Sequence, residues 1–531
     1  MLTLDDPNFG IGLLFMTVKR LILALLTVLA VVQMSLSLLE SWNQPQIQSR
    51  LELYQTNLLL HAAEWQDSDR PLSHALIGKQ PLEAAEKQYT EVRQTAEKTQ
   101  QKLQSELAAI SVIPQGQRSE GKELQATIVQ LDRLITELDL RLGILQIQQG
   151  QKDTGLKTWQ DLIARTASQP QLSQLSQLAA LLSDLWNQQL ELSTEIPKQL
   201  QTNLDGWFRY QALSKFYSGA KDREQLLALQ AQEQEIAFQS VWKLALVGGI
   251  PALGLLIGVG IILVLVVQWL WQRFRHPESA NLSPLFQNAG IPWETPWDGE
   301  TIVQVIVVGF FFIFFFVGSI LLPIVFNSLD LHPTSFDSRM RATYALSSYS
   351  LVAVGGFSVL YLSLKPFFPL PANWFKFKLV DNWFVWGLGG YFVALPLVII
   401  VSVINQGLWQ GQGGSNPILP IALENRDGWA MAIFFLTASI AAPIFEEVIF
   451  RGFLLPSLTK YLPVWGAIAA SSLLFAIAHL NISEVLPLAT LGAVMGFIYT
   501  RSRNLLAPMF LHCLWNSGTL LSLFLLGSGA N

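Results

Sequence analysis

Nine stretches of apolar residues recur along the chain, each of roughly the length that a helix needs to cross a lipid bilayer. Such a helix requires ~20 mostly apolar residues. The stretches lie at 21–39, 244–271, 302–326, 342–364, 383–404, 429–450, 462–480, 485–500 and 505–527. A long polar segment separates the first stretch from the second. The pattern predicts an all-α protein, a polytopic membrane helical bundle of about nine spans with a soluble all-helical domain.

The stretch 485–500 has 16 residues and is short for a full crossing. We therefore expect the turn at 480–484 to lie below the membrane surface. Non-helical backbone at that depth is tolerated only against protein or water, which predicts a water-filled cavity. We also expect the helix of the stretch 429–450 to continue to Leu455 and to end at Pro456.

The polar segment 40–243 is rich in Gln, Leu, Ala and Glu, which favour helices. Two helical hairpins are predicted, around Gln149–Gly150 and around Ser218–Gly219. Such pairs resemble degenerate tetratricopeptide units, and a plain helical bundle is the alternative. His61 has no Cys or carboxylate near it at metal-ligand spacing. We expect this domain to hold a protein partner or to present a substrate.

Basic residues predict the orientation, because cytoplasmic loops are enriched in Lys and Arg. With alternating spans, ten basic residues fall on the side of Lys19 and three on the other. The ten are Lys19, Arg20, Arg273, Arg275, Lys365, Lys376, Lys378, Lys460, Arg501 and Arg503, and the three are Arg339, Arg341 and Arg426. This bias places 40–243 on the non-cytoplasmic side of a bacterial plasma membrane or a thylakoid-type membrane.

The same pattern divides the chain into successive parts. The predicted parts are an N-terminal anchor at 1–39, the soluble helical domain at 40–243, a second span at 244–271, a cytoplasmic linker at 272–300 and a seven-span domain at 301–531. A basic start followed by an apolar run is also typical of a cleaved signal peptide. We favour a retained anchor, because no small-x-small cleavage site follows.

Composition narrows the class of protein further. Hydrophobic residues make up 51% of the chain and charged residues 14%, against about 25% charged in soluble domains. The net charge of -5 means that basic residues are not in excess, which argues against a nucleic-acid partner. The single cysteine, Cys513, excludes an internal disulfide framework and is expected to be a buried apolar side chain.

Ionisable side chains inside apolar spans are costly and tend to be functional. Glu446, Glu447 and Arg451 interrupt one span. Glu447 and Arg451 are four residues apart, so they share a helix face and can pair. Glu446 is rotated by about 100° from Glu447 and is the better candidate for a carboxylate that faces a cavity.

Two further spans each carry a histidine paired with a second residue at helical spacing. Phe475 and His479 are four residues apart, as are His512 and Asn516. The three patterns, EExxxR, FxxxH and HxxxN in that order, resemble those of the CAAX-protease and bacteriocin-processing (CPBP) family of intramembrane endopeptidases. The resemblance extends over 300–527 and does not include 40–243.

The resemblance implies a chemistry for these residues. Glu446 would act as the general base that takes a proton from water, with His479 helping to orient the water. His512 and Asn516 would donate hydrogen bonds to the oxyanion, and Glu447 and Arg451 would position the helix and tune Glu446. The alternative is a metal site, in which Glu446, His479 and His512 would bind a divalent ion such as zinc. No HExxH motif is present, and the sequence leaves both mechanisms open.

The predicted function is hydrolysis of a peptide bond in a membrane-associated protein or peptide. The expected partners are this substrate, the lipid bilayer and a protein bound by 40–243. The alternative is a non-proteolytic membrane scaffold or assembly factor that uses 40–243 for docking. Substitution of Glu446 or His479 distinguishes the two, because it would abolish cleavage by an enzyme and leave a scaffold intact.

Overall fold

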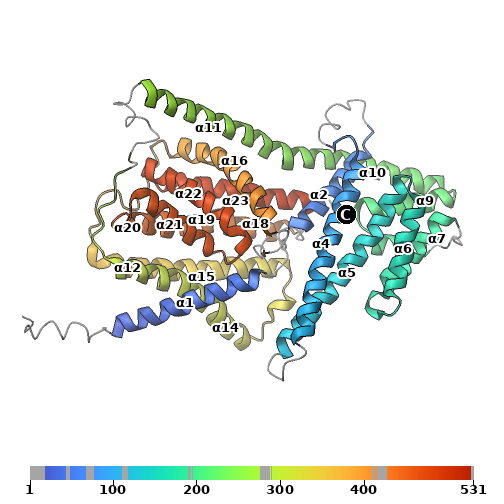
Figure 1. Cartoon of the computed structure of the whole chain (residues 1–531), viewed down its shortest axis with the longest axis horizontal. Coiled ribbons are helices and arrows are strands. Elements are labelled where there is room, and N and C mark those ends of the chain that lie inside the picture. Colours follow the sequence, from blue (N-terminus) through green and yellow to red (C-terminus); the bar gives the residue numbers. More distant parts are fainter. Residues whose placement is uncertain are drawn as a thin grey trace, which may run out of the picture. The chain divides into compact units, whose positions relative to one another are not determined.

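A computed structural model describes residues 18–42, 48–66, 77–110, 118–188, 193, 195–275, 288, 290–409, 413–414 and 427–527. Parts of the predicted anchor 1–39 and of the predicted linker 272–300 lie outside these residues. The chain divides into two compact units. One unit comprises 1–47 with 251–524, and the other comprises 48–250 with 525–531. The described residues form helices and connecting segments and contain no β-strand, in agreement with the predicted all-α class (Figure 1).

The unit 48–250 is a set of helices packed around one apolar core. Its helices are α2 (Gln48–Ala63), α4 (Pro81–Ile110), α5 (Arg118–Gln148), α6 (Lys152–Thr166), α7 (Ser173–Asn187), α8 (Ile196–Asn203), α9 (Gly206–Gly219) and α10 (Arg223–Leu244). The two predicted hairpins are present, since α5 packs on α6 and α9 on α10. Gly150, with φ +84°, forms the turn after α5 in a conformation that glycine readily adopts.

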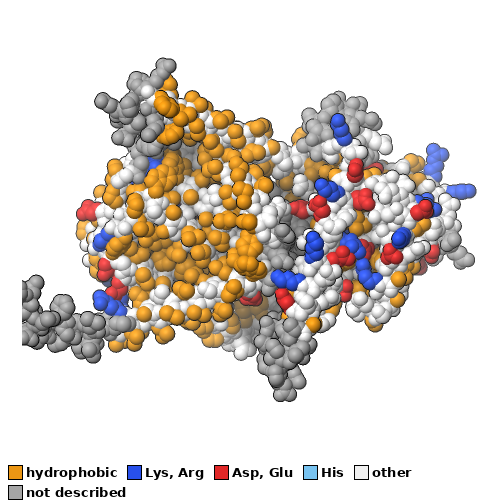
Figure 2. All heavy atoms as spheres, viewed as in Figure 1, with side chains coloured by type: hydrophobic (Ala, Val, Ile, Leu, Met, Phe, Trp, Pro, Cys, Tyr) orange, Lys and Arg blue, Asp and Glu red, His pale blue; other side chains and the backbone are white. Residues whose placement is uncertain are grey.

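The other unit, 1–47 with 251–524, consists of apolar helices and is called the membrane unit below. They are α1 (Val18–Trp42), α11 (Ile250–Arg275), α12 to α14 (within Gly299–Ser328), α15 (Ser338–Leu364), α16 (Trp383–Trp409), α18 to α20 (within Gly428–Leu458), α21 (Val464–Ile477), α22 (Val485–Ser502) and α23 (Leu506–Gly527). Eight helices of the described residues are long and apolar enough to cross a membrane. On the face drawn in Figure 2, hydrophobic side chains cover this unit, whereas charged side chains are spread over the unit 48–250.

The predicted span 462–480 is shorter in the structure than the sequence indicates. It is α21, of 14 residues, which rises about 21 Å at 1.5 Å per residue. The stretch predicted to be short, 485–500, lies in a helix of 21 residues that includes the turn η10 (Ile482–Glu484). The prediction named the wrong helix of this hairpin, because the apolar run 462–480 includes residues on both sides of α21 that are not helical.

The turn between α21 and α22 has its backbone polar groups bonded to other helices. The hydroxyl of Ser41 on α1 accepts a hydrogen bond from the N–H of Ile482 at 3.1 Å. The side-chain amide of Asn405 on α16 donates to the carbonyl of Ser483 at 2.6 Å. Leu480 adopts a left-handed conformation, with φ +60°. These bonds satisfy the backbone where the helix is interrupted.

Close approaches at glycines fix the helix packing of this unit. A Cβ on Gly258 of α11 would lie 1.9 Å from the carbonyl oxygen of Phe392 on α16. A Cβ on Gly356 of α15 would lie 2.7 Å from the ring of Phe445 and from the carbonyl oxygen of Gly309. Small residues of this kind allow the backbones of membrane helices to approach each other. α15 is thereby held against α19 (Ala442–Glu447), which carries the two glutamates of the site.

Candidate active site

The two glutamates lie at the end of a short α-helical segment between two π-helical segments. α19 (Ala442–Glu447) is preceded by η8 (Thr437–Ala441) and followed by η9 (Val448–Leu454). The helix then runs through Pro456 to Leu458 in α20 (Leu455–Leu458), so the predicted end at Pro456 is wrong. Proline has no backbone N–H to donate. It is tolerated in the first turn of a helical segment, because the wider π-turn before it does not require that N–H. Glu446 lies in the middle third of this continuous helix.

Glu447 is the centre of a buried charged cluster. Its Oε1 atom accepts hydrogen bonds from Nη1 of Arg451 at 2.8 Å and from Nδ1 of His512 at 2.8 Å. The side chains of Glu447 and Arg451 are 0% exposed. Their pairing is the one predicted from the four-residue spacing. The cluster joins the helix of α19 and η9 to α23 inside apolar surroundings, where charges persist only when they are paired.

Arg451 extends this cluster to two further helices. Its Nη2 atom donates to the carbonyl of Gly492 on α22 at 3.2 Å. Its guanidinium lies over the ring of Phe475 on α21, 4.4 Å from the centroid. The ring of Phe475 also contacts the imidazoles of His479 and His512, with centroid separations of 4.9 and 5.8 Å. Phe475 is therefore the apolar surface that the arginine and both histidines share.

Glu446 faces a different set of atoms. Its Oε1 accepts a hydrogen bond from the hydroxyl of Tyr349 on α15 at 3.0 Å, and its Oε2 lies 4.0 Å from Nε2 of His512. The side chain of Glu446 is 14% exposed, unlike that of Glu447. Sequence reasoning missed Tyr349. The available signal was a tyrosine hydroxyl in the apolar stretch 342–364, which needs a hydrogen-bond partner when it is buried.

His479 and Asn516 are each held by a backbone carbonyl. His479 lies just after α21, and its Nδ1 is 2.9 Å from the carbonyl oxygen of Phe475. The side-chain amide of Asn516 donates to the carbonyl of Ala438 in η8 at 2.7 Å. Glu447 thus bonds to both His512 and Arg451, Arg451 contacts Phe475, and Glu446 lies 4.0 Å from His512. His479 is joined to the same set through Phe475, and Asn516 is joined to the helix that carries the glutamates.

The donors of the site have the chemistry of metal ligands. In both histidines Nδ1 lies against an oxygen acceptor, which leaves Nε2 as the lone-pair nitrogen of a neutral ring. As these side chains are arranged, however, no group of three or more His, Cys, Asp and Glu among the described residues is close enough to hold a metal ion. The predicted set of Glu446, His479 and His512 does not form a three-ligand site in this arrangement.

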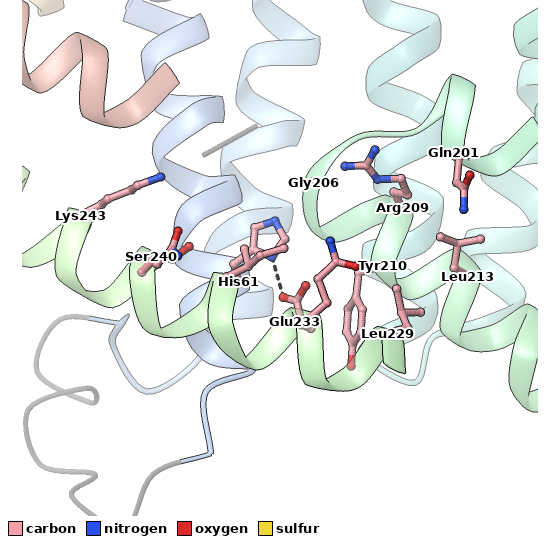
Figure 3. Close-up of a pocket in the computed structure, with 13 residues that line it drawn as sticks. His61, Gln201, Gly206, Arg209, Tyr210, Leu213, Leu229, Glu233, Ser240 and Lys243 are labelled. Carbon is pink, nitrogen blue, oxygen red and sulfur yellow. Dashed lines mark hydrogen bonds and ion pairs between the residues drawn. The ribbon is translucent and has the colours of Figure 1, made fainter. Parts of the chain in front are cut away.

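The unit 48–250 contains a second buried pair of an imidazole and a carboxylate. Nδ1 of His61 on α2 lies 2.6 Å from Oε1 of Glu233 on α10, and both side chains are almost fully buried. Figure 3 shows this pair in the wall of a cavity of about 560 Å³. Glu64 lies nearby, and its burial raises the pKa of the carboxyl, an effect that the hydrogen bond from Trp207 opposes. The cavity belongs to this unit alone.

The membrane unit is similar in sequence to known membrane peptidases. The profile of the "Rce1-like: Type II CAAX prenyl endopeptidase Rce1-like" family matches residues 428–518. The range includes all seven residues predicted for the site. YdiL of Bacillus subtilis (strain 168), a protein named as an inferred membrane peptidase, is 26% identical over 136 residues, which are 25% of this chain and 53% of YdiL. The membrane-embedded CAAX protease MroQ of Staphylococcus aureus (strain USA300) is 25% identical over 137 residues, which are 25% of this chain and 54% of MroQ.

The chain spans about half the length of the curated relatives it matches. No solved structure matches the chain. The residues matched by the family profile run from α18 to within α23 and include the glutamates, the arginine and both histidines of the site. The resemblance predicted from the three motifs is confirmed over 428–518: these residues match the Rce1-like CAAX endopeptidase family, and the similar curated proteins are membrane peptidases.

Proposed function

We propose that this protein is an intramembrane endopeptidase in which Glu446 activates a water molecule for attack on a peptide bond. The observation that carries the proposal is the pair of contacts made by the Glu446 carboxylate. It accepts a hydrogen bond from Tyr349 and lies 4.0 Å from Nε2 of His512, in the middle of an apolar helix. The substrate we propose is a membrane-associated protein or peptide.

The separation of Glu446 and His512 suits a water molecule between them. A distance of 4.0 Å is too long for a direct hydrogen bond. A water bonded to both atoms at ~2.8 Å would subtend an angle of about 90°. Glu446 would accept the proton of this water as the oxygen attacks the carbonyl carbon. His512 would orient the water through Nε2, because Nδ1 is held by Glu447.

The oxyanion would be stabilised by Asn516. An amide group carries two N–H donors, and the carbonyl of Ala438 accepts only one of them. The second remains for the oxygen that becomes negative in the tetrahedral intermediate. His479, held through Nδ1 by the carbonyl of Phe475, would direct Nε2 toward the water or the scissile peptide. Glu447 and Arg451 would position His512 and the helix without contacting substrate.

We propose a metal-free form of this chemistry. A metal at Glu446, His479 and His512 would act as a Lewis acid on the water or the carbonyl, but these residues do not form a three-ligand group in the structure. Peptide cleavage by the purified protein should therefore survive chelation by 1,10-phenanthroline. Loss of cleavage on chelation, restored by added zinc, would instead establish the metal-dependent mechanism.

The orientation of the chain is also a proposal. The excess of basic residues on one side of the spans supports a cytoplasmic position for the segments that hold Lys376, Lys460 and Arg503. The unit 48–250 would then lie on the non-cytoplasmic side, where it would bind a protein partner or present substrates. The contacts of α1 with the membrane unit support retention of this helix: Lys19 and Arg20 both pair with Glu300.

The decisive experiment is substrate trapping with Glu446→Gln. The full-length protein and this variant are purified from membranes with bound proteins, which are identified by mass spectrometry and tested for cleavage. We expect Glu446→Gln to retain intact substrates that the parent releases as fragments, while it melts at the temperature of the parent. Asp330→Asn, which alters an exposed acid, is the matched control and should cleave normally. Cleavage at the parental rate by Glu446→Gln would end the proposal.

A further inference from the structure

A polar cavity lies beside the end of α22 in the membrane unit. Its volume is about 650 Å³. Its lining includes Arg501, Arg503, Lys376, Trp293 and Trp386. Two carboxylates, those of Glu294 and Asp381, also line it, so cationic side chains outnumber acidic ones by three to two. Tryptophan and arginine together at the end of a membrane helix are typical of the lipid headgroup region.

Arg503 is held in a position that presents its charge to this cavity. Its guanidinium lies 3.3 Å from the centroid of the Trp293 ring, and one of its amino groups donates to the carbonyl of Ile291. Its Nε is buried and has no hydrogen-bond acceptor among the described residues. Arg503 also has φ +50°, a left-handed conformation that costs a side-chain-bearing residue about 1 kcal/mol or more. The site thus holds a strained arginine with an unused donor.

The charge of Arg501 adds to that of Arg503. Both residues line the cavity, and burial lowers the pKa of Arg503 to about 10, an effect that Tyr499 opposes and the nearby Arg501 charge reinforces. An anion near both guanidinium groups would offset their mutual repulsion. Planar guanidinium groups match the oxygens of a phosphate in geometry as well as in charge.

An apolar cavity adjoins the polar one. Its volume is about 510 Å³, and it lies between α11, α16 and α22. Trp386 lines both cavities. The guanidinium of Arg501 lies over the rings of Trp465 and Phe497, which are walls of the apolar cavity. A molecule with an anionic group in the first cavity could therefore extend a hydrocarbon chain into the second.

We propose that the two cavities together bind one anionic phospholipid, with its phosphate at Arg501 and Arg503 and an acyl chain in the apolar cavity. The acyl chain gains little by leaving the bilayer, because the surrounding lipid is equally apolar. The headgroup charge must therefore provide the selectivity. Each basic residue near an anionic lipid surface favours it by about fivefold. This site is distinct from Glu446 and does not depend on the proposed peptidase activity.

The test is lipid binding by the purified full-length protein, measured by native mass spectrometry. Dioleoyl phosphatidylglycerol and dioleoyl phosphatidylcholine share acyl chains and differ in headgroup charge. We expect the parent to bind phosphatidylglycerol at least fivefold more tightly, and Arg503→Gln to lose about fivefold of that preference. Arg503→Lys, which keeps the charge, should retain most of it. Lys378→Gln removes an exposed cation that lines neither cavity and should behave as the parent.

A second variant separates a lipid from free phosphate. A Cβ on Gly389, which lines the apolar cavity, would meet no atom within 4 Å, so Gly389→Leu should fold normally and fill the space meant for the acyl chain. We expect it to weaken phosphatidylglycerol binding. Inorganic phosphate should not displace the lipid from the parent. Equal binding of the two lipids, an unchanged preference in a correctly melting Arg503→Gln, or displacement by inorganic phosphate with no effect of Gly389→Leu would each overturn the proposal.

Discussion

The buried pair of Glu447 and Arg451 permits a quantitative test of how the site is held together. The perturbation is Arg451→Met, which keeps the length of the side chain and removes its charge. Both partners are 0% exposed, and Glu447 Oε1 would be left with His512 as its only hydrogen-bond donor. Breaking a buried ion pair by removing one partner costs ~3–5 kcal/mol, because the remaining charge is uncompensated. Loss of the bond to Gly492 adds to this cost.

This energy corresponds to a large change in melting temperature. At about 2–4 °C per kcal/mol for a domain of this size, Arg451→Met should lower the midpoint by about 6–20 °C. The assay is thermal unfolding of the full-length protein in detergent, followed by fluorescence at one fixed scan rate because membrane proteins often unfold irreversibly. Arg339→Gln is the control, since it breaks an ion pair of exposed Arg339 with Asp427 and should leave the midpoint nearly unchanged.

The double variant separates an ion pair from simple loss of packing. Glu447→Gln alone should also destabilise, because it leaves Arg451 charged and buried. Combining Glu447→Gln with Arg451→Met removes both charges, so the double variant should be more stable than the sum of the single effects predicts, by about 2–3 kcal/mol. Strictly additive effects of the two substitutions would show that the charges do not stabilise each other, and would refute this reasoning.

Three further predictions concern other parts of the molecule. Tyr349→Phe should slow peptide cleavage by about 10- to 100-fold without lowering the melting temperature, because it removes a hydrogen bond of ~1.5–3 kcal/mol to the Glu446 carboxylate; unchanged cleavage would contradict it. Gly258→Ala should lower the free energy of unfolding by about 1–3 kcal/mol and with it the melting midpoint, since its Cβ would lie 1.9 Å from a carbonyl oxygen of α16, while Gly260→Ala faces open space and should be tolerated. Burial raises the pKa of Glu64, so the folded state favours its protonated form; relative to Glu64→Gln, the parent should lose stability as the pH rises above 4.5, and a pH-independent difference would be inconsistent with this.

Much of the site could be predicted from local spacing. The four-residue intervals in the three motifs placed Glu447 with Arg451 and Phe475 with His479, and both contacts are present. These contacts lie within one turn of helix, or just beyond its end, so helical geometry alone determines them. The all-α class followed in the same way from the length and spacing of the apolar stretches.

Contacts between helices could not be predicted in this way. Tyr349 is 97 residues from Glu446, and its role depends on how α15 packs against α19. The π-helical segments around the glutamates have no signature in the apolar pattern. The prediction that 485–500 would be the short helix was wrong for a related reason. An apolar run does not show where the helix inside it begins and ends.

The turn between α21 and α22 has a consequence for how a substrate reaches the site. A 14-residue helix covers about 21 Å, whereas the hydrocarbon core of a bilayer is about 30 Å thick. If the other end of α21 lies at a membrane surface, this shortfall of ~9 Å would leave the chain reversal beside His479 below the opposite surface. A peptide entering the proposed site from that side would meet backbone that is already non-helical and bonded by Ser41 and Asn405, so only a few of its own residues would have to leave helical form.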